Sequence, residues 1–315
     1  MHYRSLGRAG VKVSVVGLGG NQFGGKVDVD GTRRIVHHAM DMGINFIDTA
    51  NTYSRGLSEE ALSFALSGRW ERVVLATKFR YPMGDGPNDR GGSRYHIMNS
   101  VEASLRRLRT DHIDLLQMHA WDPETPLEET MRALDDLVTS GKVRYIGSSN
   151  FLAWQMARAN DIAEMRGWTP MVTIQPHYHM LEREVERELM SYCQAFNIGI
   201  LPYFPLAGGF LTGKYREGEP PPQGTRGQTS PYVQRYFTPG NFARVRALTA
   251  WAESHGHTMT ELAIAWLLAQ PHVSSVIAGV TSVEQVDANI KAGEWELTHD
   301  ELGEVNRILD GVEPS

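Results

Sequence analysis

Residues 44–53 read INFIDTANTY, a short apolar run that ends in polar residues able to do chemistry. Two further runs follow the same pattern, VVLATK at 73–78 and IDLLQMH at 113–119. Each run has the length of a buried strand, and segments with helical periodicity separate them. In a barrel of alternating strands and helices, functional groups sit at the carboxyl ends of the strands. The residues expected to meet there are Asp48, Tyr53, Lys78 and His119.

The alternation continues along the chain. Counting from the segment 17–19, we expect eight strands, each followed by a helix, as the crossovers of a parallel sheet require. Eight units in 315 residues favour a (β/α)8 TIM barrel. A hairpin around 8–10 should precede the barrel, and the long connection 207–240, after the seventh strand, should form a functional lid. Helices are expected near 30–42, 57–67, 93–109, 152–165, 184–196, 241–255, 259–269 and 299–310, and two more should begin at Pro126 and at Ser282.

Two of these helices carry a capping-box signature at their start. The first is Thr125-Pro126-Leu127-Glu128, with proline at the first helical position, and the second is Ser282-Val283-Glu284-Gln285. The second signature directly follows the last strand. It would place a helix N-terminus at the barrel mouth, in the region where barrels often bind phosphate.

The glycine-rich segment 17–22 does not fit the alternative of an open, doubly wound sheet. It reads GLGGNQ, so Gln22 stands where the dinucleotide-binding fingerprint needs its last glycine. We instead expect these glycines to let the backbone pass close to a ligand in the barrel mouth.

Composition places the chain among ordinary globular proteins. No break in composition divides it, so we expect one domain over residues 1–315. The net charge of −6 does not favour a nucleic-acid partner. No apolar run suits a signal peptide or a membrane span, and the single cysteine, Cys193, cannot form an internal disulfide. A cytoplasmic protein is expected.

The four strand-end residues form a plausible acid–base site. A free phenol has a pKa of about 10, and a nearby ammonium lowers it, so Lys78 could prepare Tyr53 as a proton donor. Asp48 could hold Lys78 charged, and His119 could hydrogen-bond a substrate oxygen. The structural alternative is an ion pair beside two packing residues. Aromatic residues that could wall a substrate pocket follow two of the strands: Tyr81 and Trp121.

Two other kinds of site remain open. A lysine at a barrel strand end can also form a Schiff base, although Asp48 opposes the depressed pKa that Lys78 would then need. Two H-x-H pairs, at 177–179 and 255–257, could bind metal, but neither has a companion carboxylate or cysteine at a recognised spacing. No metal site is therefore expected.

Over nearly its full length the sequence resembles the aldo-keto reductases. The likeness rests on GINFIDTANTY, VVLATK, SVEASLRRLRTDHIDLLQMH, PLEETMRALDDLVTSGKVRYIGSSNF and YFPLAGGFLTGKY, in the right order. It is nearest to the bacterial branch related to potassium-channel β-subunits. The resemblance implies a (β/α)8 barrel, bound NADPH and no metal, with catalysis by Asp48, Tyr53, Lys78 and His119. The channel subunits carry asparagine in place of this histidine, so His119 favours reductase chemistry.

The resemblance also implies a set of cofactor contacts. Tyr203 should stack on the nicotinamide ring, and the long loop should cover the cofactor. Phe204 replaces the usual serine of the loop motif, and Ala288 replaces an acidic residue. The implied cofactor-binding residues are Gly20, Asn21, Asp48, Ser149, Asn150, Gln175, Tyr203, Phe204, Pro205, Leu206, Gly208, Lys214, Arg226, Gly279, Thr281, Gln285 and Asn289.

The sequence thus predicts an NADPH-dependent oxidoreductase that reduces aldehydes or ketones, with Tyr53 as general acid and with NADH as a weaker cofactor. The expected partner is a small carbonyl compound. Two alternatives stay open: a cofactor-binding regulatory subunit with vestigial turnover, and a Schiff-base lyase that uses Lys78.

Overall fold

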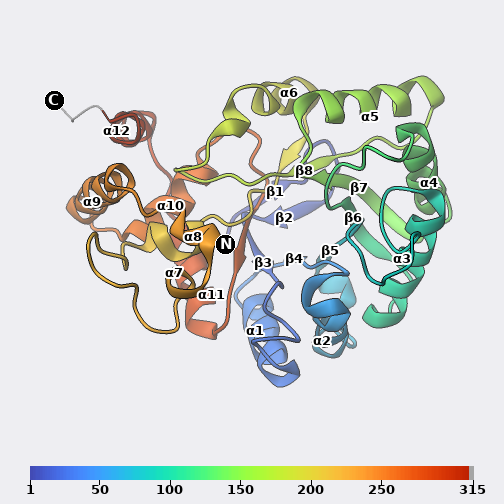
Figure 1. Cartoon of the computed structure of the whole chain (residues 1–315), viewed down its shortest axis with the longest axis horizontal. Coiled ribbons are helices and arrows are strands. Elements are labelled where there is room, and N and C mark those ends of the chain that lie inside the picture. The colour runs from blue at the N-terminus through green and yellow to red at the C-terminus, as the bar shows by residue number, and fades with distance from the viewer. Residues whose placement is uncertain (312–315) are drawn as a thin grey trace.

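The computed structural model describes residues 1–311 and contains eight parallel strands in one curled sheet (Figure 1). The strand order is β10-β3-β4-β5-β6-β7-β8-β9, so each strand lies beside its neighbour in sequence. Parallel bridges at Ile200–Val273 and Tyr203–Ile277 join the two edges of the sheet. The (β/α)8 barrel predicted from the sequence is confirmed.

The elements follow the expected alternation. The strands are β1 (Tyr3–Ser5), β2 (Lys12–Ser14), β3 (Val16–Gly19), β4 (Phe46–Asp48), β5 (Val74–Phe79), β6 (Ile113–Met118), β7 (Val143–Ser149), β8 (Thr173–Gln175), β9 (Gly199–Ile200) and β10 (Val276–Gly279). The α-helices are α1 (Val29–Asp41), α2 (Leu57–Ala65), α3 (Arg94–Leu108), α4 (Leu127–Thr139), α5 (Ala153–Arg166), α6 (Leu189–Phe196), α7 (Arg226–Thr229), α8 (Pro231–Gln234), α9 (Pro239–Ser254), α10 (Met259–Leu268), α11 (Val283–Ala292) and α12 (His299–Leu309). Short 3-10 turns are η1 (Tyr53–Gly56), η2 (Trp70–Arg72), η3 (Glu184–Glu186) and η4 (Ala207–Thr212).

The predicted hairpin is present as β1 and β2, and it closes the amino-terminal end of the barrel. Leu6 and Val13 are fully buried, and they pack into the barrel interior. Gly7 lies in the turn with φ +56°, and a Cβ there would stand 2.4 Å from backbone atoms of Val172 and Gly199. Only glycine fits this approach. The interior residues packed with the hairpin include Phe46, Val74, Ala76, Leu115, Leu201 and Ile277.

Alternation along the strands determines which residues reach the barrel interior. Phe46 packs inside the barrel and Ile47 packs against the helices, so Asp48 points inward again. The same period of two on β5 puts Lys78 above Ala76, which packs inside. The charged side chains of Asp48 and Lys78 therefore lie directly above an apolar barrel interior, and the β1–β2 hairpin covers the opposite end of that interior.

Neither of the two expected capping boxes forms as predicted. Thr125 does not cap α4, because its hydroxyl donates to Asp122 (2.7 Å) and the helix begins one residue later, after Pro126. Ser282 is the N-cap residue of α11, as expected, but its side chain makes no capping hydrogen bond. Instead the amide of Gln285 reaches back to accept from the Thr281 N–H at 2.7 Å.

Two further segments differ from the expected pattern. The helix expected near 184–196 is divided into η3 and α6. The connection after β9 carries three short helical elements, η4, α7 and α8, before α9 begins (Figure 1). We call residues 207–238 the lid segment.

Candidate active site

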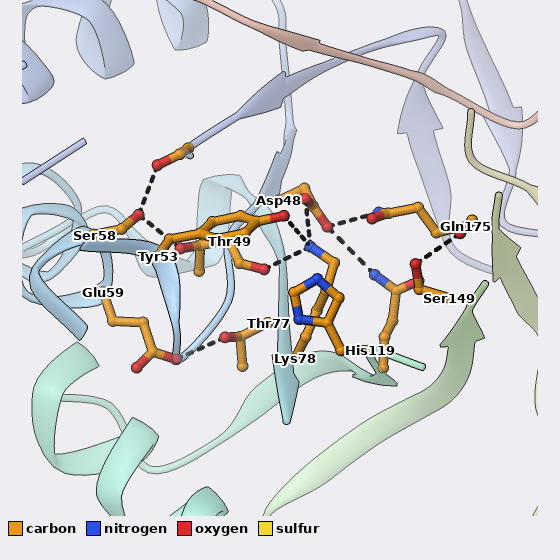
Figure 2. Close-up of polar contacts among 12 residues, drawn as sticks. Asp48, Thr49, Tyr53, Ser58, Glu59, Thr77, Lys78, His119, Ser149 and Gln175 are labelled. Atoms are coloured by element: carbon orange, nitrogen blue, oxygen red, sulfur yellow. Dashed lines mark hydrogen bonds and ion pairs between the residues drawn. The ribbon is translucent and has the colours of Figure 1, made fainter. Parts of the chain in front are cut away.

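Four side chains at the barrel mouth meet as the strand ends predict (Figure 2). Asp48 ends β4, Lys78 lies near the end of β5, and His119 directly follows β6. Tyr53 opens η1, five residues beyond Asp48, and reaches back over the strand ends. The geometry brings together all four residues that the sequence singled out.

Lys78 is the buried centre of this group. Its side chain is 0% exposed, and its ammonium donates to Asp48 Oδ2 at 2.6 Å and to the Thr49 carbonyl at 2.8 Å. It also lies 3.3 Å from the Tyr53 hydroxyl. Burial alone would lower the pKa of Lys78, but Asp48 and then Tyr53 raise it, and the net pKa lies above its usual value. The lysine is therefore held charged.

Asp48 is held by two glutamines as well as by the lysine. Its Oδ1 accepts from Gln175 Nε2 at 2.8 Å and from Gln117 Nε2 at 3.3 Å. Gln117 is not among the site residues expected from the sequence. The same period of two that marks Lys78 would have found it, because Gln117 follows inward-facing Leu115 on β6.

Tyr53 differs from the expectation in one respect. Burial raises the pKa of its phenol, and Asp48 adds to that effect, whereas Lys78 lowers it without restoring the usual value. Lys78 thus lowers the pKa of Tyr53 as expected, but burial raises that pKa by more. At neutral pH the phenol is protonated, which is the state that a proton donor needs.

His119 is neutral for a physical reason. Burial first, and then the charges of Lys78 and Arg80, lower its pKa to about 3. Its ring packs against Tyr81, with centroids 4.7 Å apart, and meets Tyr53 edge-on at 5.9 Å. Within residues 1–311 its buried Nδ1 has no hydrogen-bond partner. A neutral imidazole can donate one hydrogen bond to a substrate oxygen.

An elongated cavity of about 500 Å³ begins at Asp48 and Tyr53 and runs beneath the lid segment. Most of the implied cofactor residues line it: Gly20, Asn21, Asp48, Tyr203, Phe204, Pro205, Leu206, Gly208, Lys214, Arg226, Gly279, Thr281, Gln285 and Asn289. Residues that the sequence analysis missed also line it, among them Gln22, Lys26, Gly209, Thr212 and Thr260. The cavity fits a long ligand with its reacting end at the four strand-end residues.

Glycines let the lid segment fold tightly over this cavity. Gly208 has φ +66°, and a Cβ there would lie 2.4 Å from Val233 and 2.7 Å from the Phe204 ring. At Gly209, with φ +98°, a Cβ would lie 2.5 Å from the ammonium of Lys214. These positions exclude side chains and bring a cation against the lid backbone.

Three of the implied cofactor-binding residues, Ser149, Asn150 and Gln175, do not line the cavity. Their side chains bond to one another or to the catalytic group. Ser149 donates to the Gln175 carbonyl at 2.7 Å. Asn150, with φ +59°, donates to the His119 carbonyl at 2.9 Å. Asn150 Oδ1 accepts from the hydroxyl of Tyr203, also at 2.9 Å. Asn150 therefore links the His119 backbone to the Tyr203 hydroxyl.

The two aromatic residues proposed as substrate walls lie outside the long cavity. Tyr81 packs on His119, and the Arg80 guanidinium lies 5.3 Å from its ring. Trp121 meets Phe151 and Trp154 edge-on, at 5.3 and 5.4 Å. Trp154 is 56% exposed, so this aromatic group faces solvent beside the mouth.

The histidine pairs lie in aromatic clusters. Among residues 1–311 no three His, Cys, Asp or Glu side chains are grouped so as to hold a metal ion. His257 stacks on Trp295 and His255 on Trp251, far along the chain from the strand-end group. Cys193 is fully buried, and burial raises the pKa of its thiol to about 12.

No helix within residues 1–311 is both long and apolar enough to cross a membrane.

Comparison with known proteins agrees with this geometry. The profile of the Aldo/keto reductase family matches residues 15–310. "Uncharacterized oxidoreductase YrpG" of Bacillus subtilis is 38% identical over 99% of this chain and 97% of its own length. "Probable voltage-gated potassium channel subunit beta" of Arabidopsis thaliana is 37% identical over 93% of this chain and 91% of its own. "Versiconal hemiacetal acetate reductase" of Aspergillus parasiticus is 33% identical, with 96% and 95% covered. The chain therefore belongs to the aldo/keto reductase family of oxidoreductases.

Proposed function

We propose that this protein reduces aldehydes or ketones with NADPH and that Tyr53 donates the proton. The observation that carries the proposal is the Lys78 ammonium, which is fully buried between the Asp48 carboxylate and the Tyr53 hydroxyl, two groups that line the long cavity. We also propose that the whole chain is a single domain, since the family profile covers residues 15–310.

Each residue of the group has a distinct task. Tyr53 stays protonated at neutral pH because burial raises its pKa, so it can give its proton to a substrate oxygen. Lys78 then stabilises the phenolate left behind, and Asp48 keeps Lys78 charged and in place. His119, neutral and beside Tyr53, can orient the carbonyl oxygen by a hydrogen bond.

The cavity suits the nicotinamide cofactor that the family implies. The bound cofactor would supply hydride to the carbonyl carbon. Tyr203 at the inner end offers an aromatic face, and the exposed cations Lys214 and Arg226 at the outer end are suited to a 2′-phosphate. Because only NADPH carries that phosphate, we expect NADH to bind more weakly.

The two alternatives have less support. A Schiff-base lysine needs a lowered pKa and access to the substrate, whereas the pKa of Lys78 is raised and its side chain is 0% exposed. A regulatory subunit is suggested only by relatives named as potassium-channel β-subunits. All four acid–base residues are present: Lys78 contacts Asp48 and Tyr53, and His119 meets Tyr53 edge-on, which favours turnover.

Loss of NADPH absorbance on a panel of carbonyl compounds tests the proposal directly. Tyr53→Phe should lower turnover by about 10²–10⁴-fold and leave NADPH affinity within a few-fold, because the phenol acts only on the substrate oxygen. Near-wild-type reduction by this variant would remove Tyr53 from the mechanism.

Three further results would point elsewhere. Tight NADPH binding without turnover on a broad panel would favour the regulatory subunit. A borohydride-stabilised adduct on Lys78 would favour the lyase. Inactivation by a chelator would bring the histidine pairs back into the mechanism.

A further inference from the structure

A histidine outside the strand-end group lies flat against the aromatic residue at the inner end of the cavity. The rings of His177 and Tyr203 are stacked, with an interplanar angle of 13° and centroids 5.2 Å apart. Their backbones also form a parallel bridge, just beyond β8 and β9. Tyr203 is tied at its other end, where its hydroxyl donates to Asn150 Oδ1. The tyrosine ring is therefore held on one face and at its tip.

The same histidine touches the lid segment. Its Nδ1 and the hydroxyl of Tyr232, on α8, share a hydrogen bond of 2.9 Å. The Phe204 ring meets both His177 and Tyr232 edge-on, at 5.6 and 5.3 Å. Gly208 leaves room for Phe204, whose ring would collide with any side chain there. His177 thus bridges Tyr203 on the barrel rim and α8 in the lid segment.

Buried neighbours fix the orientation of His177. His179 is fully buried, and its Nδ1 accepts from the Leu181 N–H at 3.2 Å, so its own proton is on Nε2. That Nε2 lies 3.1 Å from His177 Nε2 and 3.1 Å from the Tyr236 hydroxyl.

Burial and the Arg235 guanidinium keep His177 neutral. Arg235 lies beside it, and Glu182, paired with Arg235 at 3.0 Å, is 4.0 Å from its Nδ1. Burial and then Arg235 lower the pKa of His177 to about 4, so the ring is uncharged at neutral pH. A neutral ring can stack on Tyr203 without bringing a buried charge to the cavity.

We propose that His177 is a positioning residue. It holds the Tyr203 ring, on which the nicotinamide ring stacks, and it couples Tyr203 to the lid segment through Tyr232. The inference rests on the proposed function, because it takes Tyr203 as the nicotinamide-stacking residue. A ring that is already fixed loses little freedom when a ligand stacks on it, so preorganisation strengthens binding. Movement of α8 away from the barrel rim breaks the hydrogen bond between Tyr232 and His177 and so removes one restraint on the Tyr203 ring.

The first test measures cofactor affinity and release for His177→Ala. Titration with NADPH and NADH, followed by protein fluorescence, gives both dissociation constants, and stopped-flow displacement gives both release rates. An aromatic stack of this kind is worth about threefold to tenfold in affinity. We expect both cofactors to weaken by that factor, mainly through faster release, because the nicotinamide ring is common to both. Loss of a phosphate contact would instead affect NADPH alone.

The second test separates the stack from the hydrogen bond. His177→Phe keeps an aromatic ring against Tyr203 but removes the bond to α8, and Tyr232→Phe removes the same bond from the other side. Each should accelerate cofactor release, and the double variant should release no faster than the singles, because all three lack one shared interaction. His299→Ala, an exposed histidine on α12, is the matched control and should behave as wild type.

The outcomes separate the inference from the proposed function. If wild type binds neither cofactor, both are overturned. If wild type binds and reduces carbonyls but His177→Ala matches it in affinity and release for both cofactors, only the inference is overturned. Additive effects of His177→Phe and Tyr232→Phe on the rate of cofactor release would also overturn the coupling. This result holds even if His177→Ala proves too unstable to measure.

Discussion

Lys78→Met is the substitution whose effect the structure defines most sharply. It keeps an unbranched side chain of similar length and removes three donated contacts, to Asp48, the Thr49 carbonyl and the Tyr53 hydroxyl. Asp48 is 2% exposed, so its carboxylate would remain buried with only the two glutamines as donors, both on Oδ1. Within residues 1–311, Oδ2 would be left with no hydrogen-bond donor.

The expected cost is large. Removal of one partner from a buried ion pair costs about 3–5 kcal/mol, because the remaining charge is desolvated and uncompensated. A domain of ordinary stability has about 5–15 kcal/mol in total, so the variant should unfold at clearly lower urea concentration. Turnover should also be lost, since no cation remains to stabilise the Tyr53 phenolate.

A double-mutant cycle with Asp48→Asn gives the decisive comparison. Lys78→Met combined with Asp48→Asn removes both charges, and replacing a buried pair by uncharged groups is often close to neutral. The double variant should therefore be more stable than Lys78→Met alone, while turnover stays lost in both. Urea unfolding followed by circular dichroism measures the four free energies of unfolding: wild type, the two single variants and the double variant. A cost below about 1 kcal/mol for Lys78→Met, or additive costs in the cycle, would refute the account of a buried, mutually dependent pair.

Three other results are expected. Between about pH 5 and 9 the rate of carbonyl reduction should not fall through ionisation of Tyr53, because its raised pKa keeps the phenol protonated. The rate should also show no inflection from His119, whose pKa is about 3. The rate of alcohol oxidation, which needs the Tyr53 phenolate, should rise with pH. Lys214→Ala and Arg226→Ala should each weaken NADPH by up to about tenfold and leave NADH unchanged, since both side chains are exposed and their contacts are screened. Gly7→Ala should lower the free energy of unfolding by about 2 kcal/mol or more in urea, because its Cβ would meet backbone at 2.4 Å.

The sequence predicts the barrel well because every strand and helix carries its own periodicity. Residues placed at strand ends by that periodicity, such as Asp48 and Lys78, meet as expected, and alternation along β6 would also have identified Gln117. Helix caps are less predictable, because competing partners decide them. The Thr125 hydroxyl bonds to Asp122 in the preceding loop, a contact that the capping pattern does not contain.

Contacts of the lid segment lie furthest from what the sequence predicts. The sequence pattern indicates His177 only as half of a possible metal-binding pair, yet its neighbours Tyr203 and Tyr232 are 26 and 55 residues away along the chain. No local periodicity connects them. The sign of the pKa shift at Tyr53 was missed for a related reason, since burial is a property of the folded assembly and outweighs the effect of Lys78.

Backbone strain in this barrel is concentrated where the chemistry is placed. Left-handed, non-glycine residues at Arg109 and Asn197 end helices, which is an ordinary use of that conformation, and His272 lies in the turn after α10. The others near the mouth each follow a site residue by one to four positions: Ser54 and Arg55 after Tyr53, Arg80 after Lys78, Asn150 after Ser149, and Phe204 and Ala207 after Tyr203. Such positions cost roughly 1–3 kcal/mol each and persist only where the surrounding structure enforces them. Here the two apolar layers of the barrel and the sealed hairpin end supply that enforcement, so the rim can hold Tyr53 and Tyr203 in orientations that a relaxed loop would not keep.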